Sequence, residues 1–474
     1  MSLYGDAMTE TTASAAGSWR ELLGRDYLGA AVVLAGGVAI YATNEFITIS
    51  LLPSAVADIG GERLYAWVTT VYLVASVMAA TTVGPILTRF GPRRAYLGAL
   101  LSFAAGSALC SLAPTMPLLL VGRVVQGLAG GVLAGLGYAV ISAALPDRLW
   151  TRASAVVSAM WGIGTMVGPA TGGLFAQFGF WRGGFGLLAV LAMAMSLLVP
   201  LALPARAERD DAAVRTRIPL RSLLLLGMAA LAVSVAVIPH NVAAIAGLLA
   251  VGVMLVAVFI VVDRRVPAAV LPRKAFGPGP LKWIYLTLGL LMAATMVDMY
   301  VPLFGQRLGA LAPVVAGFLG AALSVGWTVG EIASASITNV KATVRVVAIA
   351  PLVMAVGLGL AAVTQRDSAS IGIVVLWALA LVITGSGIGM AWPHLSAWAM
   401  GSVVDDPPQQ AVAAAAINTV QLMCGAFGAG LAGVVVNLRA TPDATASALM
   451  FGVFAALAAV GCVASYRSGR GRAD

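Results

Sequence analysis

Charged side chains are scarce in this sequence. Asp, Glu, Lys and Arg make up only 10% of its 474 residues, whereas they make up about a quarter of an ordinary soluble domain. Hydrophobic residues account for 60%, and the mean hydropathy is +0.97. The shortage of charge excludes a soluble globular fold. It predicts an all-α protein that crosses a membrane many times.

Histidine and cysteine are scarce as well. The two histidines, His240 and His394, are far apart, and the three cysteines, Cys110, Cys424 and Cys462, each lie in an apolar run. We interpret the cysteines as small buried side chains and expect no disulfide. We also expect no metal, no cofactor and no enzyme activity, because no nucleophile lies beside a base and no apolar run carries paired carboxylates.

The net charge of +9 could indicate nucleic acid binding. The basic residues are scattered through short loops without interleaved aromatic residues, so we expect no nucleic acid partner. The first 25 residues are polar and contain no apolar core with a small-residue cleavage site, so no removable signal peptide is expected. The stretch Ser18–Tyr27 is expected to form a short helix on the cytoplasmic membrane surface.

Apolar runs bounded by charged residues, proline or glycine predict fourteen membrane-spanning helices. They cover residues 28–56, 65–88, 95–112, 115–144, 153–178, 181–203, 220–238, 241–263, 281–303, 309–337, 344–364, 369–400, 410–437 and 443–465. With the N-terminus inside, the inner segments hold 22 Lys and Arg, and the outer loops hold five, namely Arg63, Arg182, Arg307, Arg366 and Arg439. The positive-inside rule therefore places both termini in the cytoplasm. We expect a multi-pass protein of the cytoplasmic (inner) membrane.

Two polar linkers divide these runs into six, two and six. The expected segments are a cytoplasmic tail 1–27, a six-helix bundle 28–203, a linker 204–219, an inserted helix pair 220–263, a linker 264–280, a second six-helix bundle 281–465 and a tail 466–474.

The fifth apolar run contains glycines at a spacing of four residues. Gly164, Gly168 and Gly172 line one helix face, which lets a neighbouring helix approach to backbone contact. Pro169 removes a helical hydrogen bond and bends the helix. Ordinary glycine packing is the alternative interpretation. The full string, from Gly164 to Gly173, resembles the fifth-span antiporter motif of the major facilitator superfamily. This resemblance implies a packed hinge.

Two motifs of the first span and of the loop after the second span extend the resemblance. Residues Asn44–Gly60 resemble the first-span motif of drug/proton antiporters, in which an acidic residue precedes a Leu-Pro pair. Residues Gly84–Arg94 resemble the signature of the loop between spans two and three. The matching positions of that signature are Gly84, Arg89, Gly91, Arg93 and Arg94. Thr88 stands where the family has an aspartate, so a charge-based lock must be weaker or made differently.

Later motifs are similar to a particular branch of this superfamily. Residues Arg123–Gly131 resemble the fourth-span motif with its arginine. Residues Val266–Gly277 and Gly385–His394 resemble the fourteen-span drug/proton antiporters. The resemblance implies the superfamily fold, with two six-helix bundles plus two inserted spans.

Four ionisable side chains lie within the apolar runs, namely Glu45, Arg123, Asp298 and Glu331. Each costs at least about 2.5 kcal/mol near the centre of a membrane helix, so each is a functional candidate. Glu45 and Arg123 are both about 12 Å below the outer ends of their spans, so they can pair. A distance that changes with conformation would load and release a proton, whereas a constant distance would make a structural ion pair.

Asp298 and Glu331 each have two interpretations. Asp298 occupies the place in the second bundle that Glu45 occupies in the first, which predicts a second proton or cation site or a carboxylate that caps a broken helix. Glu331 either gates the cytoplasmic side or hydrogen-bonds to Ser334 or Thr338.

Polar, aromatic and methionine side chains within the runs are weaker candidates for an adaptable substrate pocket, because most such residues pack in the core or face lipid. They are Asn44, Trp161, Met166, Tyr300, Trp327, Trp392 and His394. Asp58 and Glu62, at the outer mouth, are expected to be solvated loop charges.

The resemblance implies a proton-coupled secondary transporter that exports lipophilic compounds, cationic ones included, by alternating access. The implied partners are a lipophilic small molecule, protons and the lipid bilayer, and the energy source is the proton gradient. We expect a monomer. The alternative is a proton-coupled exporter or symporter of an endogenous metabolite or lipid with the same fold. A membrane enzyme and a non-transporting receptor are weaker alternatives.

Overall fold

A computed structural model describes residues 18–204, 218–239, 241–337, 339–403, 407–438 and 443–470. These residues form helices joined by short connections, and they contain no β-strand. Twelve helices are long and apolar enough to cross a membrane, and the shorter α9 (Leu220–Val235) is also apolar. Helices suit such runs because they satisfy every backbone hydrogen bond within one segment.

The first half of the chain forms α1 to α8. Their bounds are α1 Trp19–Leu22, α2 Leu28–Ile59, η1 Glu62–Leu64, α3 Tyr65–Ala80, α4 Val83–Ser111, α5 Met116–Ala139, α6 Ile141–Ala144, α7 Asp147–Gln177 and α8 Trp181–Ala202. The expected surface helix near residue 20 is the single turn α1.

The rest of the chain begins with α9 and ends with α17. The further bounds are α10 Val242–Asp263, η2 Arg273–Phe276, α11 Leu281–Thr295, η3 Met296–Tyr300, α12 Val301–Gly309, α13 Pro313–Ala335, α14 Val340–Thr364, α15 Ile371–Gly401, α16 Pro407–Val436 and α17 Asp443–Gly469.

The boundary predicted at residue 88 is wrong, because α3 already ends at Ala80. The hydroxyl groups of Thr81 and Thr82 donate to the carbonyls of Met78 and Ala79, at 2.8 and 2.6 Å. Such side-chain bonds occupy carbonyl groups at the end of a helix and compete with its continuation. The segment expected to be a loop is therefore largely the first part of α4.

The ninth apolar run is not one regular helix. It contains α11, the 3₁₀ turn η3 and α12 in succession. Pro302 has no N–H to donate to the carbonyl of Asp298, so a regular α-helix cannot pass through this point without losing a bond. Asp298 therefore lies in the break between two helices.

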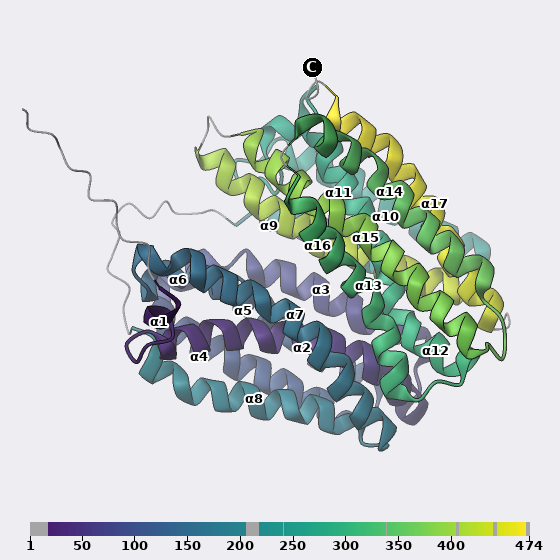
Figure 1. The fold of residues 1–474 in the computed structure, drawn as a ribbon, viewed down its shortest axis with the longest axis horizontal. Helices are drawn as coiled ribbons and strands as arrows, with labels where there is room; N and C mark the ends of the chain where they lie inside the picture. Colours follow the sequence, from purple (N-terminus) through teal and green to yellow (C-terminus); the bar gives the residue numbers. More distant parts are fainter. Residues whose placement is uncertain are drawn as a thin grey trace, which may run out of the picture.

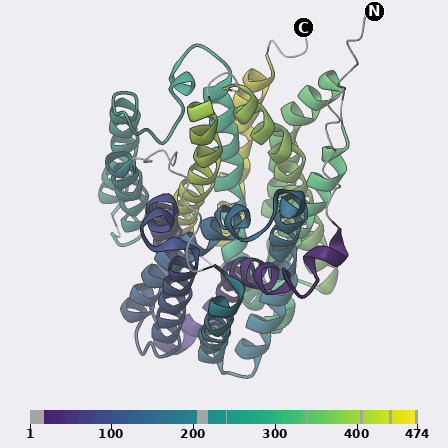
Figure 2. The same ribbon diagram turned by 90° about the vertical axis from the view of Figure 1, so that its left-hand side faces the viewer.

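The helices lie in two groups, α1 to α8 and α9 to α17 (Figure 1). In the first group α2 packs on α7 and α8, and α5 packs on α3 and α4. In the second group α15 packs on α13 and α14, while α11 packs on α16 and α17. The groups meet mainly where α7 contacts α13 and where α3 contacts α16. Figure 2 shows α9 and α10, in teal, at the edge of the second group.

The exposed surface of these helices is strongly apolar. Leu201 is 87% exposed, Phe178 78% and Val363 77%. A soluble protein rarely exposes many large apolar side chains in continuous patches, whereas lipid tails accept them. Several polar side chains, Asn44 and Arg123 among them, are instead buried between the helices.

Candidate functional site

Arg123, in α5, is almost fully buried, with 2% of its surface exposed. All of its hydrogen-bond partners are neutral oxygens from α2, α3 and α5. They are Asn44 Oδ1 at 3.1 Å, Thr48 Oγ1 at 3.2 Å, Gln126 Oε1 at 2.8 Å and the Val68 carbonyl at 3.1 Å. The guanidinium carbon also lies 4.1 Å from the centre of the Tyr72 ring. This cage holds the cation between three helices without a carboxylate.

Further bonds orient the groups of the cage. The Thr48 hydroxyl donates to the Asn44 carbonyl at 2.7 Å, and Gln126 Nε2 donates to Ser107 Oγ on α4 at 2.7 Å. Buried networks whose members bond to one another fix the side chains in place. Two buried donors at the edge of the cage, Asn44 Nδ2 and the Tyr72 hydroxyl, have no protein partner within the described ranges.

Glu45 is half-buried on α2, directly after Asn44. Four ion pairs connect described residues, and none of them joins Glu45 to Arg123. The pairing that depth allows is therefore not formed in this conformation.

Asp298 is half-buried in η3, where it lines a cavity of about 10 Å³. The other lining residues come from α2, α7 and α13, and they are Phe46, Ile49, Ser50, Pro169, Gly317, Gly320 and Ala321. Glu45 and Asp298 belong to different halves of the chain. The structure places both in the region where the two groups of helices meet.

The glycines of the antiporter-like string face α2. A Cβ atom at Gly164 would stand 2.9 Å from the Ala42 side chain, and one at Gly172 would stand 2.8 Å from the Ile47 carbonyl. At Gly168 it would collide with Phe46. The spacing of four residues thus produces the close helix contact that the sequence predicts.

Gly173 belongs to a different contact, because a Cβ there would stand 2.5 Å from Val314 Cα on α13. The Tyr65 and Tyr300 rings stack at 4.7 Å nearby, and the Tyr65 hydroxyl donates to the Met299 carbonyl at 3.1 Å. We call this region, where the ends of α2, α3 and α7 meet η3, α12 and α13, the outer seam, because the distribution of Lys and Arg predicts that it lies outside.

Asp58 and Glu62 are exposed, as expected, and each also forms an ion pair that the sequence did not predict. Glu62 accepts from Arg307 of α12 at 2.9 Å, and Arg307 also bonds to Asp443 of α17 at 3.2 Å. Arg307 therefore joins both groups of helices across the outer seam.

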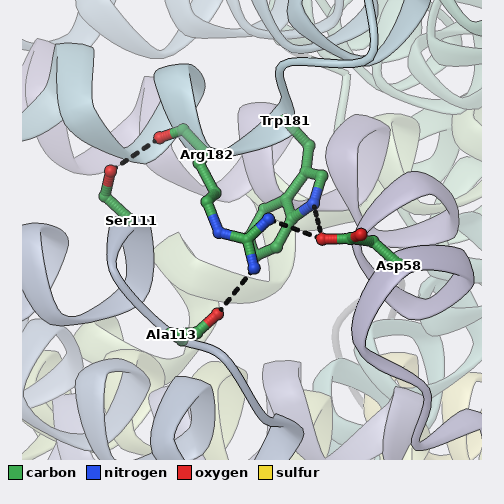
Figure 3. A network of polar contacts seen from close by, with 5 residues as sticks. All are labelled: Asp58, Ser111, Ala113, Trp181 and Arg182. Atoms are coloured by element: carbon green, nitrogen blue, oxygen red, sulfur yellow. Dashed lines mark hydrogen bonds and ion pairs between the residues drawn. The ribbon is translucent and has the colours of Figure 1, made fainter.

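Asp58 belongs to a network within the first group (Figure 3). Its carboxylate accepts from Trp181 Nε1 at 3.1 Å and from Arg182 at 2.5 Å. Arg182 also donates to the Ala113 carbonyl at 3.0 Å, while its own carbonyl accepts from the Ser111 hydroxyl at 2.9 Å. These bonds tie the ends of α2 and α4 to the start of α8.

A second cluster of candidates lies between α13 and α15. Trp327 Nε1 donates to Glu331 at 3.2 Å, and the Trp327 and Trp392 rings are 5.4 Å apart. His394 Nε2 lies 3.1 Å from the Ser334 carbonyl. The partner of the Glu331 carboxylate is thus Trp327 and not Ser334, while Thr338 lies outside the described residues.

The remaining pocket candidates are separated. Trp161 contacts Tyr41 edge-on at 5.6 Å in the first group, whereas Met166 is 60% exposed. Tyr300 is 1% exposed and belongs to the outer seam.

The loop 2–3 motif lies at the start of α4, at the opposite end from the outer seam. Gly91 has φ +74°, a left-handed conformation that glycine adopts readily, and it interrupts the helix. Gly84 and Arg93 are half-buried, and Arg89 is exposed. The Thr88 hydroxyl donates to the Pro85 carbonyl at 3.0 Å, so this side chain makes a local bond in place of a charge contact.

At the same end, Glu21 of α1 pairs with Arg148 of α7 at 2.6 Å. The hydrogen bond from Arg148 holds the pKa of Glu21 below its usual range. This pair fixes the single turn of α1 against α7.

Several functional candidates escaped the sequence analysis, and Thr48, Gln126, Tyr72 and Ser50 are the main ones. Gln126 follows Arg123 by three residues, and Thr48 follows Asn44 by four, so each pair shares a helix face. That spacing is a signal that could have identified both.

The apolar helices and the exposed lipid-compatible surface together define a multi-pass membrane protein. The sequence matches the Major Facilitator Superfamily over residues 34–433. The chain belongs to this superfamily, whose members transport solutes and are not enzymes.

Individual relatives agree with this assignment. The chain is 60% identical over 465 residues to a probable multidrug-efflux transporter of Mycobacterium tuberculosis, covering 97% of this chain and 98% of the relative. It is 25% identical to multidrug resistance protein 3 of Bacillus subtilis, covering 77% of this chain and 72% of that protein.

Solved structures show the same fold at low identity. A D-xylose-proton symporter aligns with a TM-score of 0.67 and 15% identity, covering 93% of this chain and 97% of the symporter. The nucleoside transporter NupG aligns with a TM-score of 0.65 and 13% identity, covering 94% and 98%.

Proposed function

We propose that this protein is a proton-coupled exporter of lipophilic compounds, cationic ones included, that works by alternating access. Its similarity to probable multidrug-efflux transporters supports export. The observation that carries the coupling proposal is the buried cage around Arg123. The cage includes Asn44, the residue directly before Glu45. The proton gradient is the energy source, and the protein acts as a monomer.

The proposed topology has fourteen spans in a six, two and six arrangement. Both termini lie in the cytoplasm, and the protein resides in the cytoplasmic membrane. The surplus of Lys and Arg in the predicted inner segments supports this orientation. The packing of α9 against α3 and α16 is consistent with an inserted pair at the rim of two bundles.

The proposed coupling groups are Glu45, Arg123 and Asp298. In this conformation neutral oxygens solvate Arg123, so Glu45 is free to hold or release a proton. A change in helix packing that brings Glu45 against Arg123 would favour the carboxylate and expel the proton. Protonation of Glu45, together with Asp298, would then bias the equilibrium between inward-facing and outward-facing states.

The proposed moving parts are the glycine string and the two ends of the bundles. The packed hinge is the glycine string of α7, whose glycines let α7 contact α2 and α13 closely. The string consists of Gly164, Gly168, Pro169, Gly172 and Gly173. The cytoplasmic side is gated by Gly84, Arg89, Gly91, Arg93 and Glu331. The proposed substrate contacts are Asn44, Trp161, Met166, Tyr300, Trp327, Trp392 and His394.

Substrate-induced proton release from detergent-solubilised protein tests the coupling. We expect the wild type to release protons when a lipophilic cation is added and the Glu45→Gln variant to release few. Asp58→Asn is a matched control, since Asp58 is an acid of the same helix whose described bonds lie in the outer network of the first group. Equal release from the wild type and Glu45→Gln would end the proposal for Glu45.

The direction of transport needs a separate measurement in proteoliposomes with an imposed pH gradient. Expulsion against the inward proton gradient is expected. Uptake stimulated by outside acid would contradict export and favour a symporter of the same fold.

A further inference from the structure

The cavity beside Asp298 has the dimensions of a site for one small molecule of solvent. Its volume is about 10 Å³, roughly the space that a single water molecule requires. Ser50 lines it from α2, and Asp298 lines it from η3. The cavity therefore lies between a residue of the first group of helices and a residue of the second.

The Ser50 hydroxyl lacks a partner in the described part of the chain. The residue is 1% exposed, and its Oγ atom makes no hydrogen bond. A helical serine or threonine can satisfy itself at the carbonyl four residues earlier, as Thr48 does at Asn44. The Ser50 hydroxyl instead lies toward α13, 2.8 Å from the position that a Cβ at Gly317 would take. A buried hydroxyl in this position is costly unless something bonds to it.

Two of the residues that line this cavity are polar, namely Ser50 and Asp298. A buried water needs two to four polar partners. Ser50 and Asp298 supply two such partners, whereas Phe46 and Ala321 form apolar walls.

We propose that one water molecule occupies this cavity and joins the Ser50 hydroxyl of α2 to the Asp298 carboxyl group of η3. The water links the two groups of helices while the outer seam is closed, and it leaves one of them when the seam opens. The effect of this water on transport rests on the proposed function, but the existence of the water site does not.

A map of the full chain in which ordered waters are visible tests the site directly. We expect density in the cavity within hydrogen-bond distance of Ser50 Oγ and Asp298. An empty cavity in a map that shows other buried waters would overturn the proposal.

A pair of matched variants tests the same site by stability. Ser50→Ala removes a partner of the water and should lower the midpoint of thermal unfolding by roughly 1–2 °C. Ser222→Ala is the control, because Ser222 is also fully buried, has no partner among the described residues and does not line this cavity. We expect no loss in the control.

Removal of an unbonded hydroxyl is close to neutral, so a dry cavity predicts no loss in either variant. That result, or an equal loss in both, would refute the water site. Neither experiment uses substrate or a proton gradient. Failure here is therefore separate from failure of the transport proposal, which the Glu45→Gln comparison decides.

Discussion

Removal of the Arg307 side chain should favour opening of the outer seam. Arg307 is the residue whose ion pair with Glu62 crosses between the two groups of helices at 2.9 Å, while its bond to Asp443 at 3.2 Å stays within the second group. The change Arg307→Gln removes the crossing pair and keeps most of the side-chain volume.

The expected magnitude follows from exposure. The Arg307 side chain is 39% exposed and that of Glu62 is 69% exposed, and exposed pairs contribute about 0.2–1 kcal/mol. Of the two Arg307 ion pairs, only the one with Glu62 crosses the seam, so its loss should lower the closed-to-open ratio roughly 1.4- to 5-fold.

The assay is the distance distribution between two spin labels on the outer surface. Leu112 of the first group and Ile371 of the second are 76% and 74% exposed, so labels there should not disturb packing. The three native cysteines are first replaced by alanine. We expect a larger long-distance population in Arg307→Gln than in the parent protein.

Salt provides an internal check. At 1 M salt the screening length falls to about 3 Å from about 8 Å at physiological strength. High salt should therefore open the parent protein and leave Arg307→Gln nearly unchanged.

The matched control is Arg182→Gln, because Arg182 pairs with Asp58 inside the first group. It should lower thermal stability without a change in the distance distribution. An equal shift in both variants, or a salt response that survives in Arg307→Gln, would refute the role of the crossing pair.

Three further predictions concern the helix contacts, the surface turn and the cage. Gly168→Ala should destabilise the protein by about 1–3 kcal/mol, because its Cβ would collide with Phe46; Gly162→Ala, which faces open space, should be neutral in the same thermal unfolding assay. Since the pKa of Glu21 is lowered in the folded state, its contribution is present above about pH 4.5 and is lost as the pH falls through the folded value. Unfolding midpoints measured between pH 6 and 3 should therefore fall more steeply in the wild type than in Glu21→Gln; parallel curves would show that the pair contributes nothing. Arg123→Lys keeps the charge but loses the planar fork that reaches several oxygens at once, so gradient-driven expulsion should fall about tenfold or more, and full activity would show that charge alone suffices.

The sequence by itself determined the class of protein and the approximate ends of most of its apolar helices. Runs of about twenty apolar residues can be stable only as membrane helices, and the cost of a charge in hydrocarbon marks Glu45, Arg123, Asp298 and Glu331 without reference to neighbours. The contact of the glycine face of α7 was predictable too, because a period of four residues fixes which side chains share a helix face.

Only the tertiary structure decided which partners these groups have. It surrounds Arg123 with Asn44, Thr48 and Gln126, leaves Glu45 unpaired with it, and sets Asp298 beside Ser50. Depth along a helix follows from residue count, but the rotation of each helix and the packing between helices do not. Those depend on contacts between residues far apart in the chain, which periodicity within one helix cannot specify.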